Sequence, residues 1–277
     1  MRKLLSANFS RLWKDKIFWL EMVLILIISI GNMIHGCELI PEMVRFGYSV
    51  TIDNYYYSLF PVLGLFLAIF IALFLGTEYS DGTFRNKLVV GHTRVAIYLA
   101  NFTVCFVAGM FFMVAWMIGG LVGVPFFGGW VIGVQGFITY FLIAFLAVAA
   151  QVGIMVLLSM LSSNKAITAI ATILFFFGLL IVASIIYNRL CEPELYSGVE
   201  ATMEGIQMTD PSPNPDYLSG TFRTIYEWIL DILPTGQGLM MANVEIVHPL
   251  RNMLSSIVIA MTTTIFGVVS FQKKNLK

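Results

Sequence analysis

Residues 76–94 read "GTEYSDGTFRNKLVVGHTR" and separate two runs that are almost entirely apolar. Of the 277 residues in the chain, 58% are hydrophobic and 12% are charged, and the mean hydropathy is +0.86. Ordinary soluble domains carry about 25% charged residues. The composition therefore predicts a membrane protein in which 76–94 is a loop outside the hydrocarbon, with its charges concentrated at Glu78, Asp81, Arg85, Lys87 and Arg94.

Six apolar stretches are long enough for the roughly 20 residues that a helix needs to cross a bilayer. They cover about 17–34, 59–76, 97–124, 136–161, 166–187 and 252–271. A transmembrane barrel would alternate apolar and polar residues, and stretches such as "FLIAFLAVAA" do not. We expect an all-α membrane protein with six transmembrane helices, forming one transmembrane domain over 1–277.

The distribution of Lys and Arg orients these spans, because basic residues are retained on the cytoplasmic side. With both termini cytoplasmic, the inner segments hold twelve of them: Arg2, Lys3, Arg11, Lys14, Lys16, Arg85, Lys87, Arg94, Lys165, Lys273, Lys274 and Lys277. The outer segments hold four: Arg45, Arg189, Arg223 and Arg251. We therefore expect the protein in the plasma membrane, with segment 76–94 on the cytoplasmic side.

Residues 1–16 place Leu5, Phe9, Leu12 and Trp13 on one helical face with basic residues around it. This pattern predicts an interfacial helix in the cytoplasmic headgroups. A basic flank that only orients the first span is the alternative. Glu21 follows soon after the membrane entry and is expected to reach the inner surface.

Two outer segments differ in length and composition. In 35–58, Pro41 is expected to break the helix, and Tyr55, Tyr56 and Tyr57 to anchor at the membrane interface. The segment 188–251 begins with an acidic, proline-rich half that predicts a mobile loop. Cys37 and Cys191 both fall on this outer side, and their pairing is left open.

The second half of 188–251 predicts short helices. "FRTIYEWILDILP" has helical periodicity but is too short to span, so it should lie at or dip into the outer leaflet. A second short helix follows Pro234, with Thr235 as a plausible N-cap. Broken backbone at membrane depth requires cover by protein or a water-filled cavity. We therefore expect outer re-entrant helices between spans five and six, around Leu233, Pro234, Thr235, Gly236 and Gln237.

The cytoplasmic segment 77–96 is longer than a connection requires. Gly82 permits a sharp bend, and "TFRNKLVV" predicts a short helix with Thr83 as N-cap. Phe84 and Leu88, four residues apart, form an apolar ridge that Arg85 and Lys87 flank. Such a helix suits docking into a protein groove. The alternative is a surface helix lying on lipid headgroups.

The motifs of common catalytic sites are missing from the sequence. There is no G-x-x-x-x-G-K-[ST] phosphate loop, so any nucleotide energy would come from a partner chain. The three histidines are scattered without zinc-site spacing. The S-x-x-K match at Ser162–Lys165 lacks its companion motifs. We predict no catalytic residues, no metal site and no nucleic-acid partner.

"EYSDGTFRNKLVVGHTR" after the second span resembles the first cytoplasmic loop of permease subunits of ATP-binding-cassette transporters of the second, exporter-like membrane class. "LPTGQ", at Leu233 to Gln237, resembles the outer re-entrant segment of the same family. Glu78, Asp81, Gly82 and Thr83 match the loop motif. Arg85, Lys87 and Arg94 are inferred as helix-flanking contacts from charge and position.

This resemblance implies a cytosolic ATPase pair, with ATP and Mg on that partner, bound to two such permeases that form a homodimer or a heterodimer. The loop helix would be the coupling helix that rests in the ATPase groove. An acidic outer loop and an aromatic-rich short helix would suit an amphipathic or cationic exported cargo, such as an antimicrobial peptide, a drug or a lipid. The rival readings are a secondary transporter or channel without an ATPase, and a membrane enzyme.

Overall fold

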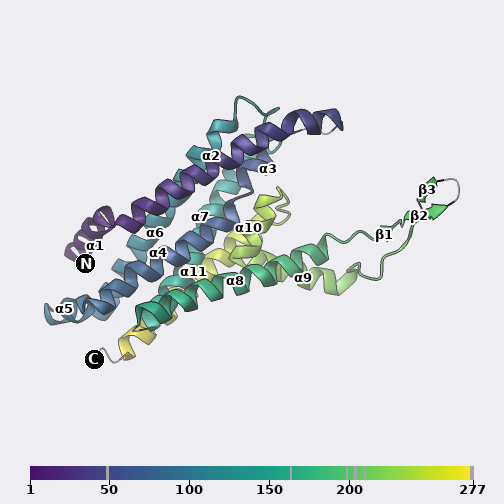
Figure 1. Cartoon of the computed structure of the whole chain (residues 1–277). Helices are drawn as coiled ribbons and strands as arrows, with labels where there is room; N and C mark the ends of the chain where they lie inside the picture. Colours follow the sequence, from purple (N-terminus) through teal and green to yellow (C-terminus); the bar gives the residue numbers. More distant parts are fainter. Residues whose placement is uncertain (48–49, 163, 198, 203–204, 209, 275–277) are drawn as a thin grey trace.

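The computed structural model describes residues 1–47, 50–162, 164–197, 199–202, 205–208 and 210–274. In this part of the chain, six helices are long and apolar enough to cross a membrane. Figure 1 shows them running side by side along a common direction. They are α2 (Lys16–Arg45), α4 (Phe60–Ser80), α6 (Arg94–Gly120), α7 (Gly133–Leu161), α8 (Lys165–Leu190) and α11 (Pro249–Lys273). The predicted all-α, six-span architecture is confirmed.

Shorter elements gather at the two ends of this bundle. Helix α1 (Arg2–Lys14), helix α5 (Thr83–Val89) and the C-terminal end of α11 lie at one end (Figure 1). Toward the opposite end lie α3, the 3-10 turn η1, α9 and α10, with bounds Ile52–Tyr57, Leu121–Gly123, Gly220–Ile232 and Pro234–Ala242. We call these the α5 end and the α9 end.

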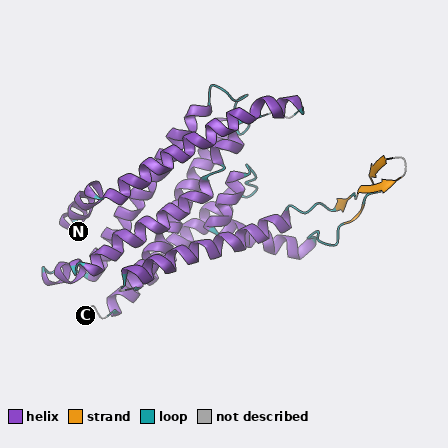
Figure 2. Cartoon of the chain, viewed as in Figure 1, coloured by secondary structure: helices purple, strands orange, loops and turns teal. Residues whose placement is uncertain are grey.

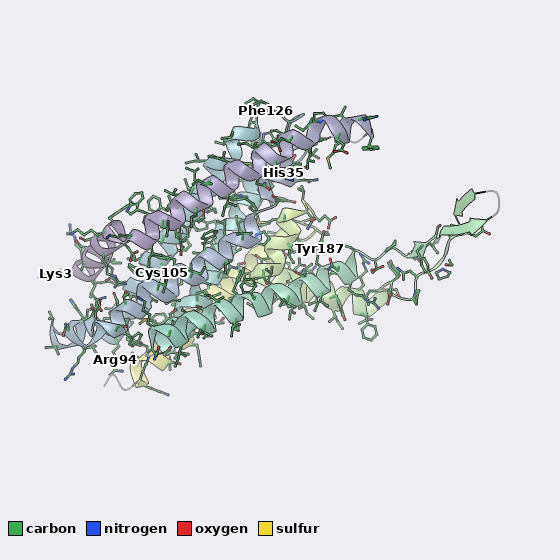
Figure 3. The ribbon with its side chains drawn as sticks, viewed as in Figure 1. Lys3, His35, Arg94, Cys105, Phe126 and Tyr187 are labelled. Carbon is green, nitrogen blue, oxygen red and sulfur yellow. The ribbon has the colours of Figure 1, made fainter. Side chains whose placement is uncertain are left out.

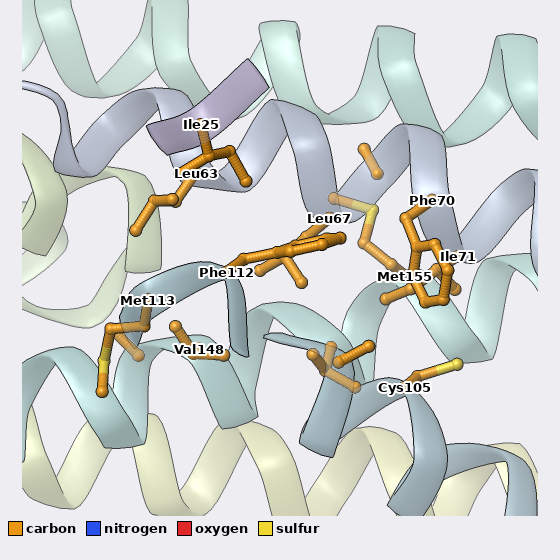
Figure 4. Close-up of a cluster of buried hydrophobic side chains, with 14 of the residues drawn as sticks. Ile25, Leu63, Leu67, Phe70, Ile71, Cys105, Phe112, Met113, Val148 and Met155 are labelled. Atoms are coloured by element: carbon orange, nitrogen blue, oxygen red, sulfur yellow. The ribbon is translucent and has the colours of Figure 1, made fainter. Parts of the chain in front are cut away.

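The core lies where α4, α6 and α7 meet. Helix α4 turns Leu67, Phe70 and Ile71 inward, where they meet Phe112 and Met155 from α6 and α7 (Figure 4). Helices α2, α8 and α11 expose many large apolar side chains on the outside of the bundle. Because apolar side chains are stable in hydrocarbon, these outer faces fit a lipid environment.

Helix α2 continues past the expected break at Pro41. It ends only at Arg45, with Pro41 inside the helix. A proline removes one intrahelical hydrogen bond, but the next turn still closes, because the Phe46 amide donates to the Glu42 carbonyl over 3.2 Å. The prediction that Pro41 ends the helix was therefore wrong.

Glu21 and two of the three tyrosines also differ from expectation, because packing within the bundle covers them. Glu21 is 4% exposed, and neither carboxylate oxygen has a hydrogen-bond partner among the described residues. Tyr56 and Tyr57 are buried rather than anchored at the interface. The Tyr56 ring centroid lies 4.9 Å from that of Trp130, and the Tyr57 centroid lies 4.9 Å from that of Tyr140.

The acidic half of 188–251 forms an arm of paired strands that extends from the helical body (Figure 2). Strand β1 (Leu195–Tyr196) pairs antiparallel with β4 (Ser212–Pro213). Beyond them, β2 (Val199–Thr202) pairs antiparallel with β3 (Gly205–Met208). Where the sequence predicts a mobile loop without regular structure, the described residues thus form two short antiparallel strand pairs, with Pro213 at the end of β4.

Candidate functional site at helix α5

The predicted short helix after the second span is present as α5. Gly82 precedes it with φ +65°, a left-handed conformation that favours glycine because it has no Cβ. The chain thereby turns from α4 into α5 within two residues. Thr83 is the first helical residue and not the N-cap, a position that Gly82 occupies, and no side chain caps the helix.

The apolar ridge of α5 faces the bundle and not the open side of the helix. Phe84 is 2% exposed; its ring centroid lies 4.4 Å from that of Tyr79 and 5.8 Å from that of Phe271. Leu88 is half-buried against the same core. These two side chains fix α5 to the membrane domain, which corrects the expectation that they form the docking ridge.

The opposite face of α5 is open. Arg85 and Asn86 are exposed, and Val89 and Val90 at the C-terminal end are 80% and 76% exposed. Asp81, at the C-cap of α4, is exposed as well. A charged and apolar surface is thus presented by a helix whose other face is buried.

Glu78 lies beneath this helix in the last turn of α4. Its side chain is 0% exposed, and it forms ion pairs with Arg11 of α1 and Lys87 of α5. The Lys87 Nζ to Glu78 Oε1 distance is 2.6 Å. Arg11 also donates to the Phe74 carbonyl and lies 3.6 Å from the centre of the Phe74 ring. Glu78 is therefore an internal anchor and is not available to touch a partner protein.

Two asparagines complete what we call the Glu78 network, namely Asn8, Arg11, Glu78, Lys87 and Asn101. The fully buried Asn101 of α6 donates to Glu78 Oε2 over 3.2 Å. Asn8 of α1 donates to Asn101 over 2.6 Å and accepts from Lys87 over 3.0 Å. One continuous set of hydrogen bonds joins α1, α4, α5 and α6.

The charges of the network attach α5 rigidly to the bundle. Burial lowers the pKa of Lys87, and the neighbouring Glu78 carboxylate opposes that shift. Removing one member of a buried ion pair costs about 3–5 kcal/mol, because an uncompensated charge remains. Movement of α5 away from α4 would separate the same charges, so the helix is expected to move with the bundle.

Arg94 and Lys274 hold the C-terminal end of α11 (Figure 3 labels Arg94). Arg94, the first residue of α6, donates to the carbonyls of Phe271, Gln272 and Lys274. Lys274 donates to the Tyr79 hydroxyl over 2.8 Å and to two carbonyls at the end of α7. Burial lowers the Lys274 pKa to about 8. Arg94 therefore caps a helix, and it does not flank α5.

At the α9 end, the residues of "LPTGQ" form a compact joint between α9 and α10. Leu233 is the C-cap of α9, Pro234 begins α10, and a Cβ on Gly236 would collide with the Leu230 carbonyl oxygen. Thr235 does not cap α10, because its hydroxyl donates instead to the Leu179 carbonyl of α8. Protein covers this broken backbone, as membrane depth would require.

Gln237 ties this joint to α11. Its buried amide donates to the carbonyls of Asp231 and Asn252 over 2.8 and 3.0 Å. Its oxygen accepts from Ser256 over 2.9 Å. Asp231, 2% exposed, forms an ion pair with Arg251 near the start of α11.

Helix α11 thus contacts both the α5 end and the α9–α10 joint. Phe271 packs on Phe84 at the α5 end, while Arg251 and Ser256 meet the joint at the α9 end. Its 25 residues correspond to about 37 Å at 1.5 Å per residue. Sequence spacing does not reveal this connection, because the contacting residues are far apart in the chain.

Sequence reasoning missed five side chains that build these sites: Asn8, Arg11, Asn101, Asp231 and Arg251. A signal was present for one of them, since Asn101 interrupts an otherwise apolar helical face. All three cysteines are free thiols. Within the described ranges, no group of three or more His, Cys, Asp or Glu residues is placed to hold a metal ion.

Six apolar helices, a short helix anchored at one end and a broken helix at the other define a multi-pass membrane protein with the layout of a transport permease. The chain belongs to the ABC-2 family of transporter proteins, whose family model matches residues 4–184. The match includes α5 and the Glu78 network and ends before the α9–α10 joint. A comparison with curated proteins found no match. Permeases of this family generally work with an ATP-binding subunit.

Proposed function

We propose that this chain is the permease subunit of an ATP-driven exporter, and that α5 docks in a groove of a separate cytosolic ATPase. The open face of α5, carried by a firmly anchored helix, is the observation that supports the proposal most strongly. A docked helix transmits force only if it moves as one body with the membrane domain. The Glu78 network and the Phe84 contacts supply that attachment.

In this proposal two ATPase copies, carrying ATP and Mg, act on two permeases in the plasma membrane, with the termini and α5 in the cytoplasm. Closure of the ATPase pair moves α5, and α11 carries the displacement from Phe84 to the α9–α10 joint. ATP shifts the balance between two conformations only through its different affinity for them. The cargo is amphipathic, such as an antimicrobial peptide, a drug or a lipid.

Co-expression of the full chain with a candidate ATPase tests the docking. Arg85→Glu and Val89→Asp alter only exposed positions of α5, so we expect intact permease but loss of the copurifying ATPase and of cargo-stimulated ATP hydrolysis. Lys3→Glu, at an exposed basic position of α1, is the matched control and should leave both unchanged. Unchanged copurification and hydrolysis in the two α5 variants would refute docking through this face.

A secondary transporter or channel is the alternative function. It requires transport by the purified chain alone, driven by an ion gradient. Liposomes that contain the chain without an ATPase separate the two: our proposal expects no uptake under a proton or sodium gradient, and uptake only after ATPase and ATP are supplied. Gradient-driven uptake without ATP would favour the alternative.

A further inference from the structure

A cavity of about 420 Å³ opens at the α9 end between α8, α9, α10 and the segment that leads into α11. Tyr187, labelled in Figure 3, lies on its α8 side. Pockets for small organic ligands range from about 300 to 1,000 Å³. Neither the family match nor the docking of α5 assigns a role to this cavity.

The wall of the cavity is mainly apolar. Five aliphatic side chains line it: Leu190, Leu230, Met240, Ile246 and Val247. Methionine adapts its shape to irregular ligands, and the tyrosine ring offers a face that attracts cations. An amphipathic molecule could therefore bury its hydrocarbon part here.

Three carboxylates line the same space, and two of them are neutralised. Glu227 pairs with Arg223 at 3.3 Å. Asp231 pairs with Arg251, and His248 lies 3.4 Å from its carboxylate. The charges of these two ion pairs cancel and leave the charge of the third carboxylate.

That third carboxylate is Glu245, on the segment between α10 and α11. It is exposed and forms no ion pair with any residue in the described part of the chain. The Tyr187 hydroxyl donates to its Oε2 over 2.7 Å. One negative charge therefore lies beside an aromatic ring at an apolar cavity.

We propose that this cavity binds an amphipathic organic monocation, with the positive charge between the Glu245 carboxylate and the Tyr187 ring and the apolar part against Leu230, Met240 and Ile246. The negative charge of Glu245 would repel an anion of equal size. The site itself does not require the ATPase; only the role of the cation as exported cargo rests on the proposed function. Binding can thus be tested without the partner.

Tetraphenylphosphonium and tetraphenylborate are suitable probes because they share a shape and differ in charge. With the full chain in lipid nanodiscs and no ATPase, we expect saturable binding of the phosphonium and none of the borate, with empty nanodiscs subtracted. Glu245→Gln should weaken phosphonium binding about tenfold. Glu194→Gln, an exposed carboxylate at the same end outside the cavity, should leave it unchanged.

Cys191 provides a second readout, because it is exposed and lines the cavity. In a Cys37→Ser background, where the remaining Cys105 is buried, a trimethylammonium methanethiosulfonate should modify Cys191 faster than a sulfonate analogue. Tetraphenylphosphonium should slow that modification. In Glu245→Gln, the two rates should converge while the unfolding temperature stays unchanged.

Equal saturable binding of both ions would show an apolar pocket, such as one for a lipid chain, and would overturn the proposal. Unchanged phosphonium affinity in Glu245→Gln would do the same. Because these measurements omit the ATPase, they are independent of whether the α5 variants fail or succeed in the docking experiment.

Discussion

The α5 end and the α9 end hold their short helices by different means. At the α5 end, one buried carboxylate, Glu78, is held by two cations from other helices. At the α9 end, the Gln237 amide bonds to the backbone carbonyls of Asp231 and Asn252 and to the hydroxyls of two serines, and an ion pair joins Asp231 to Arg251. Ion pairs between separate helices resist separation, whereas amide bonds at a helix break satisfy polar groups that lipid cannot. The first arrangement suits the transfer of force, and the second suits a stable irregular backbone.

This contrast predicts the largest effect at Glu78. Glu78→Ala leaves Arg11 and Lys87 without their anion, so we expect the free energy of unfolding to fall by about 3–5 kcal/mol. Thermal unfolding of the purified chain in detergent measures the change. Asp81→Ala removes an exposed carboxylate three residues away and should alter stability by less than about 0.5 kcal/mol. Similar losses in both variants would contradict the role of Glu78 as an internal anchor.

A steric effect of intermediate size is expected at the α9–α10 joint. In Gly236→Ala the new Cβ meets the Leu230 carbonyl oxygen, so we expect a loss of about 1–3 kcal/mol from overpacking. Gly178→Ala in α8 is the matched control, since nothing lies within 4 Å of its added Cβ. That variant should be neutral or stabilising, because alanine favours helices. If Gly236→Ala behaves like the control, the joint is looser than its contacts indicate.

A smaller effect should appear in the aromatic contact between α5 and α11. A double-mutant cycle with Phe84→Leu and Phe271→Leu is expected to give a coupling energy of about 0.5–1.5 kcal/mol. Chemical denaturation in micelles supplies the four stabilities. The pair Phe84→Leu and Phe222→Leu, at opposite ends of the molecule, should be additive. Additivity in the first cycle would remove the link through which α11 is proposed to act.

The last prediction concerns Lys274 and pH. Its pKa falls from an ordinary 10.5 to about 8 because burial disfavours the charged form. Between these values the unfolded chain binds more protons than the folded one, so the stability of the wild type relative to Lys274→Met should rise with pH from about 8 to 10.5. Unfolding temperatures of both proteins across this range measure the difference. A difference that stays flat or falls would contradict the burial of Lys274.

Much of the fold was predictable because hydrophobic length is a local property. The six spans, α5 and α9 all follow from runs or periodicities within a single window, and Gly82 takes the conformation that its residue type suggests. The position of Lys277, counted among the inner basic residues, lies outside the described residues. Which side of the membrane each end faces stays a prediction from charge.

The candidate site was predicted less completely, because a side chain's partners depend on other helices. The sequence predicts Glu78 and Lys87 as contacts to a partner protein. Nothing in 76–94 reveals that Asn8, Arg11 and Asn101 surround them. Phe84 looked like a docking residue for the same reason. A charged segment has the same local pattern whether its side chains meet solvent or a neighbouring helix.

The sequence by itself determined that this chain spans a membrane with six helices and turns sharply at Gly82 into a short helix. In lipid the polar groups of the backbone must bond within the segment, and for an apolar run the helix satisfies them. Only the tertiary structure decided which face of that helix is free, which charges are internal, and that α11 joins the two ends. Those outcomes depend on contacts between residues as distant as Phe84 and Phe271, and no local pattern encodes such contacts.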